Sequence, residues 1–175
     1  MGYNGHGELG LGDTSQRNLP VQILPGGVRE VVSGTYHSLF IKEDGSLWAM
    51  GQNTNGQLGT GNTTQQNSPT QIVASGVAQV AGGDYHSLFL KTDGSLWAMG
   101  WNNSGQLGNG NTTQQSSPVQ IFPPPPFKPT SKTELQTAVD LWVSDNATAL
   151  STYGEINTWD MSLITDMTEL FKNKT

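Results

Sequence analysis

The sequence predicts a mainly β protein: two antiparallel four-stranded β-propeller blades, forming a partial propeller, followed by a small α/β C-terminal segment. A sequence unit recurs along the first two thirds of the chain. Each unit holds short apolar runs separated by turns, and 22 of the 175 residues are glycine, which favours many short strands. The composition changes after the four prolines at 123–126.

The repeat is readily aligned. Residues 2–50 align with residues 51–99 without a gap, and 29 of the 49 positions are identical. Residues 100–122 begin a third copy, which matches the second at 16 of 23 positions. Such a period is typical of repeat architectures, in which each unit packs against its neighbours.

Within each unit, two apolar runs flank an Asp-Gly pair. In the first unit these runs are Leu39–Ile41 and Leu47–Met50, on either side of Asp44–Gly45, and Asp93–Gly94 occupies the same position in the second unit. This pattern predicts a β-hairpin with a type I′ turn, in which both central residues have positive φ. Because the runs are continuous, both faces of the sheet are apolar. We expect the next copy of the unit to cover them.

Two further strands complete each unit. One is predicted at 28–32, and another follows the proline, at 21–24, 70–73 and 119–122. The intervening glycine-rich stretches, such as 51–61, are predicted to be long ordered loops. Four strands in a unit of this length are typical of a propeller blade.

The second unit carries an extended signature. Its residues are Gly51, Asn53, Gly56, Gln57, Leu58, Gly59, Pro69, Gly83, His86, Ser87, Leu88, Asp93, Gly94, Leu96, Trp97 and Gly100. The first unit has His37, Asp44, Gly45 and Trp48 at the matching positions. Over residues 2–122 the pattern resembles the regulator-of-chromosome-condensation repeat family.

This resemblance implies whole blades at about 28–73 and 77–122, preceded by a lone outer strand at 20–24. Residues 1–122 are then an incomplete propeller domain, because such propellers have about seven blades. We therefore expect upstream blades outside this chain. Terminal blades expose apolar faces, so we also expect the chain to be poorly stable or self-associating.

Residues 123–130 are predicted to be a stiff proline-rich linker. After it, the capping-box pattern at 131–134 predicts a helix over 132–144. A helical turn is predicted over 147–153, ended by Gly154, then a strand over 156–159 and a helix over 166–172.

This tail resembles the start of a BspA-like leucine-rich-repeat surface module, predicted at 131–175. The residues that carry the resemblance are Leu135, Gln136, Ala138, Val139, Trp142, Trp159, Asp160, Ser162, Thr165, Asp166, Met167, Leu170 and Phe171. The resemblance implies an extracellular or cell-surface location. Since only one unit is present, we expect the chain to be a fragment of a longer protein.

The sequence offers little for catalysis. His37 and His86 recur at one repeat position, which favours a structural role. A triad of Asp84, His86 and Ser87 is not supported, since strand neighbours point to opposite faces and Thr35 replaces the aspartate in the first unit. The pair Asp160 and Asp166 has no metal-loop spacing, and there is no cysteine. We expect no enzyme, no catalytic residue, no cofactor and no metal.

Charge and exposure point to protein partners. The formal net charge is −6, so the basic footprint of a nucleic-acid binder is missing. No apolar stretch is long enough to span a membrane, and residues 1–10 do not form a signal peptide.

Trp48 and Trp97 are expected in the core. Trp101 replaces Tyr3 and Gln52 of the other units, which makes it a candidate partner contact.

The predicted function is a non-catalytic protein-binding or adhesion scaffold from a secreted or cell-surface protein, with a protein partner of unknown identity. The alternatives are a guanine-nucleotide exchange factor for a small GTPase, for which the gap-free repeats leave no inserted loop, and a propeller that inhibits an enzyme by capping its active site. The family resemblance implies both alternatives.

Overall fold

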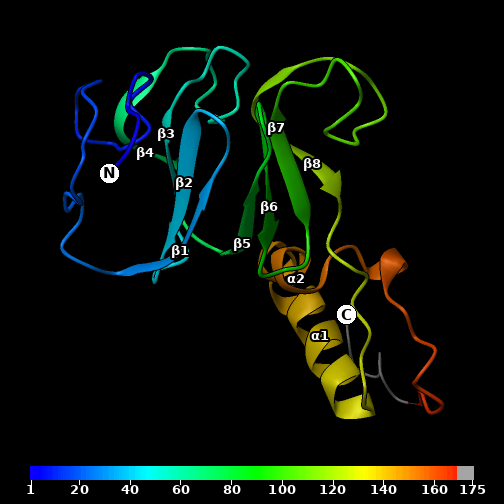
Figure 1. Cartoon of the computed structure of the whole chain (residues 1–175). Coiled ribbons are helices and arrows are strands. Elements are labelled where there is room, and N and C mark those ends of the chain that lie inside the picture. The colour runs from blue at the N-terminus through cyan, green and yellow to red at the C-terminus, as the bar shows by residue number, and fades with distance from the viewer. Residues whose placement is uncertain (169–175) are drawn as a thin grey trace. The chain divides into compact units, whose positions relative to one another are not determined.

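A computed structural model describes residues 1–168 and separates the chain into two compact units, Met1–Pro124 and Pro125–Thr175 (Figure 1). The first unit contains two antiparallel four-stranded sheets, with strand orders β1-β2-β3-β4 and β5-β6-β7-β8. The strands are β1 Val28–Ser33, β2 His37–Lys42, β3 Leu47–Gly51, β4 Gln66–Val73, β5 Val77–Gly82, β6 His86–Lys91, β7 Leu96–Gly100 and β8 Gln115–Phe122. The predicted fold class is confirmed.

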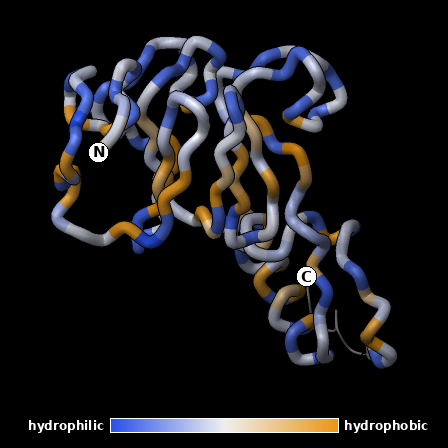
Figure 2. Tube along the Cα trace, viewed as in Figure 1, coloured by the Kyte–Doolittle hydropathy of each residue, from blue (hydrophilic) through white to orange (hydrophobic). Residues whose placement is uncertain are grey.

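The core of this unit lies between the two sheets. Leu39, Ile41 and Leu47 of the first sheet are completely buried. They belong to one hydrophobic cluster with Phe89 and Met99 of the second sheet. In Figure 2 the hydrophobic colouring is concentrated on the strands of these sheets. One apolar face of the first blade is therefore covered by the next copy, as the continuous apolar runs predict.

The β2–β3 hairpin forms as predicted, but its turn differs. Gly45 N donates to Lys42 O at 3.0 Å, so Glu43 and Asp44 are the central residues and Gly45, with φ 77°, is the fourth. The type I′ turn centred on Asp44–Gly45 was therefore a wrong prediction. In this longer hairpin the left-handed glycine follows the turn and returns the chain to the ladder.

The outer strands begin earlier than the sequence predicts. β4 starts at Gln66, before Pro69 rather than after it. Pro69 is tolerated because β4 is the sheet edge and the register between β3 and β4 is irregular between Ala49 and Gly51. At such a position the missing proline N–H removes no ladder hydrogen bond.

The predicted lone strand at 20–24 does not form, and these residues are irregular. In the complete blades the equivalent strand pairs with β3 or β7. Among the described residues, no strand pairs with residues 20–24. A strand requires such a partner for its N–H and C=O groups.

Buried asparagines organise the glycine-rich loops. Asn53 Nδ2 donates to the carbonyl oxygens of Asn62 and Thr64 at 3.0 and 3.1 Å, and its Oδ1 accepts from Leu58 N at 3.0 Å. Asn4 and Asn102 make the same pattern in the other two copies. One amide thus satisfies backbone groups that the loop would otherwise leave unpaired.

The second unit contains α1 Lys132–Ser144, α2 Asn146–Tyr153 and the 3-10 helix η1 Ile156–Thr158. Ser131 Oγ accepts from Glu134 N at 3.2 Å, as the capping pattern predicts. A separate cluster centred on Leu135, Val139 and Trp159 forms its core. Neither helix in the described residues has the length and hydrophobicity that crossing a bilayer requires.

Two predictions for this unit need correction. The expected strand over 156–159 is η1, because the Glu155 carbonyl accepts from Thr158 N at 2.8 Å and closes a helical turn. The expected helix over 166–172 is not helical at 166–168. Its remaining residues, 169–172, lie outside the described part of the chain.

Candidate functional site

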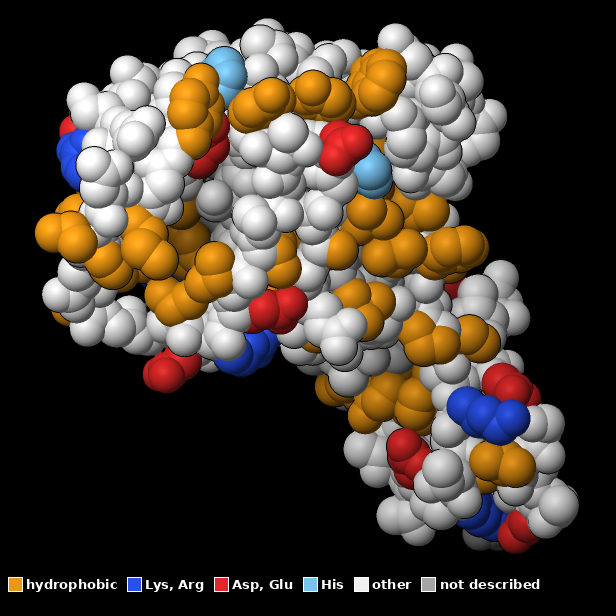
Figure 3. All heavy atoms as spheres, viewed as in Figure 1, with side chains coloured by type: hydrophobic (Ala, Val, Ile, Leu, Met, Phe, Trp, Pro, Cys, Tyr) orange, Lys and Arg blue, Asp and Glu red, His pale blue; other side chains and the backbone are white. Residues whose placement is uncertain are grey.

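A row of aromatic rings runs across all three repeat copies on one surface of the first unit. We call it the aromatic strip, and it consists of Tyr3, His6, Tyr36, Tyr85 and Trp101. Successive ring centroids are 6.3, 5.1, 6.4 and 5.8 Å apart. Figure 3 shows such a row of hydrophobic side chains, with a histidine beside it, along the upper edge of that view. Tyr3 is exposed and the other four rings are half-buried, and partly exposed aromatic rings are enriched in binding sites.

The repeat places the middle of the strip. Tyr36 and Tyr85 occupy the same repeat position, immediately before β2 and β6. Their carbonyl oxygens accept from Gln52 N and Trp101 N, each at 2.8 Å. These hydrogen bonds hold Trp101 at the end of β7 beside Tyr85, so its orientation is set by the blade.

Residues that differ between copies form the ends of the strip. Tyr3 is 61% exposed and stands where the second copy has Gln52. It lies over Gly5, at which a Cβ would be 2.1 Å from the Tyr3 hydroxyl. The equivalent residues, Thr54 and Asn103, could not accept a ring in this position. Tyr3 and Gly5 therefore depend on each other.

Carboxylates flank the strip. Asp84, beside Tyr85 in the chain, accepts from Thr35 Oγ1 at 2.9 Å and is exposed. Glu8 Oε2 accepts from His6 N at 2.9 Å, while its Oε1 is buried without a hydrogen-bond partner among the described residues. The edges of the strip therefore carry hydrogen-bond acceptors and negative charge.

The lysines and arginines of this unit are engaged elsewhere. Lys42 and Lys91 lie over Trp48 and Trp97, 4.1 and 4.6 Å from the ring centroids. The other two pair with an aspartate or with backbone carbonyls, namely Arg17 with Asp13 and Arg29 with Val77 and Ala78. None of these contacts involves a ring of the aromatic strip.

Histidine joins the blades. His37 Nε2 lies 2.9 Å from Ser87 Oγ, whose hydroxyl donates to Gln57 O at 2.8 Å. Because that hydroxyl hydrogen is used, His37 is the donor and carries its proton on Nε2. Burial, and secondarily the charge of His86, lowers the pKa of His37 to about 4. The neutral ring therefore links the first blade to the second.

The residues of the excluded triad do not assemble. Ser87 bonds His37 of the other blade, Asp84 bonds Thr35, and burial lowers the pKa of His86. In the described residues no group of three or more metal-ligating side chains occurs. Asp160 and Asp166 pair with Lys128 and Lys132, each at 2.8 Å.

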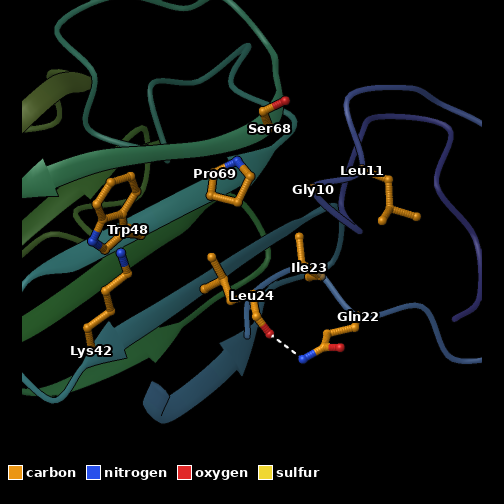
Figure 4. Close-up of a pocket in the computed structure, with 9 residues that line it drawn as sticks. All are labelled: Gly10, Leu11, Gln22, Ile23, Leu24, Lys42, Trp48, Ser68 and Pro69. Atoms are coloured by element: carbon orange, nitrogen blue, oxygen red, sulfur yellow. Dashed lines mark hydrogen bonds between the residues drawn. The ribbon is translucent and has the colours of Figure 1, made fainter. Parts of the chain in front are cut away.

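The remaining signature residues lie in the blades and their loops. A Cβ at Gly56 would be 2.5 Å from Ser116 Cα, and one at Gly59 would be 2.7 Å from Met99 Sδ. Trp97 packs against the core, whereas Trp48 and Pro69 line a surface pocket (Figure 4). Gly51 lies against Tyr36 and His37, and Gly83 lies against the ring of His86. Leu58 is in the core, and Asp93 and Gly94 are in the β6–β7 turn.

Sequence reasoning singled out Trp101 but missed the strip. The signal that could have found it is the recurrence of tyrosine immediately before both repeated histidines, together with aromatic residues at one repeat position in the first and third copies. What the sequence does not give is their spacing in three dimensions.

The same repeat is found by comparison with known families. Residues 1–41, 44–90 and 93–131 match the model of the regulator of chromosome condensation (RCC1) repeat. The chain belongs to the RCC1 repeat family. A second RCC1 model matches residues 28–57 and 77–106, so the family signature covers both blades.

Solved structures share this fold. Human WBSCR16 is 29% identical, with a TM-score of 0.59 over 70% of this chain and 34% of that protein. Yeast RCC1 (Prp20), crystallised with Kap60, is 21% identical, with a TM-score of 0.57 over 70% of this chain and 32% of that protein.

Prp20p from Saccharomyces cerevisiae, described with its binding to Gsp1p and histones, is 20% identical, with a TM-score of 0.56 over 69% of this chain and 33% of that protein. The chain thus spans about a third of the length of each of these structures. No curated protein sequence matches it.

Proposed function

We propose that the RCC1 blades form a non-catalytic protein-binding scaffold whose contact surface is the aromatic strip. The observation that carries this proposal is the unbroken row of five rings across three repeats. Aromatic side chains supply most of the binding energy in many protein interfaces. RCC1-fold proteins bind protein partners, since yeast Prp20 is described with Kap60, Gsp1p and histones.

The chemistry of the strip favours a partner segment with arginine or lysine. The ring faces are negative, and Asp84 and Glu8 add carboxylate oxygens beside them. A guanidinium can stack on Trp101 or Tyr85 and reach Asp84 at the same time. The net charge of −6 supports attraction of such a segment.

A peptide array probed with the full chain tests this proposal. Trp101→Ala should weaken binding of arginine-containing peptides by about 30-fold, the effect of losing an interface hot spot. Leu19→Ala is the matched control, since Leu19 is 75% exposed but lies outside the strip. If the same peptides bound wild type and Trp101→Ala equally well, the strip would not be the contact surface.

Two alternatives give different outcomes. A chain that accelerates nucleotide release from a small GTPase acts as an exchange factor, and one that lowers the turnover of an enzyme acts as an inhibitor. If either activity were found and Trp101→Ala left it unchanged, that activity would replace the proposed function.

We also propose that the parent protein is displayed outside the cell and continues with a BspA-like module. The tail residues with that resemblance, such as Trp159 and Asp166, support this proposal. Fractionation of the source cells tests it, because recovery only from the cytosol would contradict it.

A further inference from the structure

Four consecutive prolines, Pro123–Pro126, follow the last strand of the second blade, and we call them the proline segment. All four are exposed. At the equivalent repeat positions the earlier copies read Pro-Gly-Gly-Val, at 25–28, and Ala-Ser-Gly-Val, at 74–77. The run of prolines is therefore not part of the repeat, and the packing of blades gives no reason for it.

Covalent geometry fixes the shape of the proline segment. Each pyrrolidine ring holds φ near about −65°, and the residue before a proline is confined to extended backbone. The peptide bonds of the described residues are trans. A run of trans prolines with these angles is a polyproline II helix with about three residues per turn. Pro123 and Pro126 therefore lie on the same edge of that helix.

The proline segment offers hydrogen-bond acceptors and no donors. Proline has no backbone N–H, and among the described residues no group donates to the carbonyl oxygens of the segment. The last ladder pair of β8 joins Phe122 to Leu96, one residue before the segment. The segment thus presents four apolar rings and their unpaired carbonyl oxygens to solvent.

The residues after the segment are held by the second unit. The ring centroid of Phe127 lies 4.6 Å from that of Tyr153 and 5.1 Å from that of Trp159. The carbonyl oxygen of Phe127 accepts from Asp160 N at 2.8 Å. Lys128 Nζ pairs with Asp160 Oδ2, also at 2.8 Å. The exposed run therefore ends at Phe127, and the nearest basic side chain already has a partner.

Such a segment is suited to be recognised by another protein. Because its shape is set before any partner arrives, it loses little conformational freedom on binding. Proline rings pack well against aromatic rings, and tryptophan N–H or tyrosine O–H groups can donate to the carbonyl oxygens between them. Both features of the segment are thus matched by one kind of groove.

We propose that the proline segment is a ligand for a protein domain whose groove is lined by tryptophan and tyrosine. The groove packs against the edge that carries Pro123 and Pro126, and its indole or phenol groups donate to the proline carbonyl oxygens. Lys128 takes no part, since its ammonium group is paired with Asp160. In this interaction the chain is the ligand, and the segment shares no residue with the aromatic strip.

Binding of the full chain to purified SH3, WW and EVH1 domains, immobilised for interferometry, tests the proposal. Grooves of these three kinds bind polyproline II segments, and at least one domain should bind wild type. Changing Pro123 and Pro126 together to alanine should weaken that binding by about 10-fold or more. The urea midpoint of this variant should stay close to that of wild type, because neither side chain is buried.

Three variants serve as controls. Pro25→Ala is the matched one, because Pro25 is exposed and stands at the repeat position of Pro123 without a neighbouring proline. Lys128→Ala tests whether the basic residue contributes, and Trp101→Ala tests whether the aromatic strip does. All three should bind the domain as tightly as wild type does.

Several results would overturn the proposal. One is the absence of binding to all three domains at about 1 mM chain. Another is binding that survives the double proline substitution, because the contact would then lie elsewhere in the chain. A loss for Lys128→Ala as large as that for the prolines would show that a basic flank supplies the recognition. A loss for Trp101→Ala would assign the binding to the aromatic strip instead.

Discussion

Two glycines at one repeat position allow a direct test of the packing between blades. Gly56 and Gly105 have nearly the same left-handed backbone, with φ of 72° and 76°. Their surroundings differ. A Cβ at Gly56 would be 2.5 Å from Ser116 Cα and 2.9 Å from Gln115 O, both backbone atoms of β8, whereas Gly105 has nothing within 4 Å. Alanine at each position therefore separates backbone strain from steric conflict.

The expected losses in stability follow from backbone strain and steric conflict. Alanine in the left-handed region costs about 1–2 kcal/mol, and this is the whole expected loss for Gly105→Ala. Gly56→Ala adds overpacking against a strand backbone that cannot rotate away, about 1–3 kcal/mol more. We therefore expect losses in the free energy of unfolding of about 1–2 kcal/mol for Gly105→Ala and about 2–5 kcal/mol for Gly56→Ala.

Urea unfolding followed by tryptophan fluorescence measures both losses, at a dilution where the wild type is monomeric. Unchanged m-values would show that both variants unfold from the same compact state. Equal losses for the two variants would refute the reasoning, because the contact of the 51–61 loop with β8 would then contribute nothing.

Two further predictions concern His37 and the equivalent residues Ile41 and Leu90. The folded pKa of His37, about 4, lies below its ordinary 6.5, so between these pH values the unfolded chain binds a proton that the folded chain does not. The free energy of unfolding should fall by about 3 kcal/mol in total as pH falls through this window. Denaturation at several pH values measures this dependence, and His37→Gln should make the free energy of unfolding less dependent on pH. Ile41→Ala should lower the free energy of unfolding by about 2–5 kcal/mol, as measured in thermal melts. Leu90→Ala should lower it by roughly half as much, because Leu90 is only half-buried. Equal losses for the two variants would contradict this difference in burial.

Local sequence patterns were sufficient for much of the fold. The Asp-Gly pairs predicted both hairpins, since few residues other than glycine accept the left-handed backbone that follows the turn. The pattern at 131–134 placed the start of α1 because capping is a local hydrogen bond. The recurrence of Asn53 in all three copies, by contrast, did not reveal its bonds to Asn62 and Thr64.

Other features needed partners that are distant in the sequence. Residues 20–24 carry the same strand pattern as 69–73 yet stay irregular, because within residues 1–168 only the latter have a neighbouring strand. Predicting the type I′ turn failed for a related reason: the register of the β2–β3 ladder decides which residue occupies the fourth turn position.

The sequence by itself determined that this protein is built from repeated β units, because hydrophobic periodicity and turn residues act over a few positions. Only the tertiary structure decided which copies of a repeated residue are buried and which are exposed. Leu39 and Leu88 have the same neighbours in sequence, but one faces another blade and the other does not. The aromatic strip likewise brings together rings from Tyr3 to Trp101, since burial and contact depend on what lies across space.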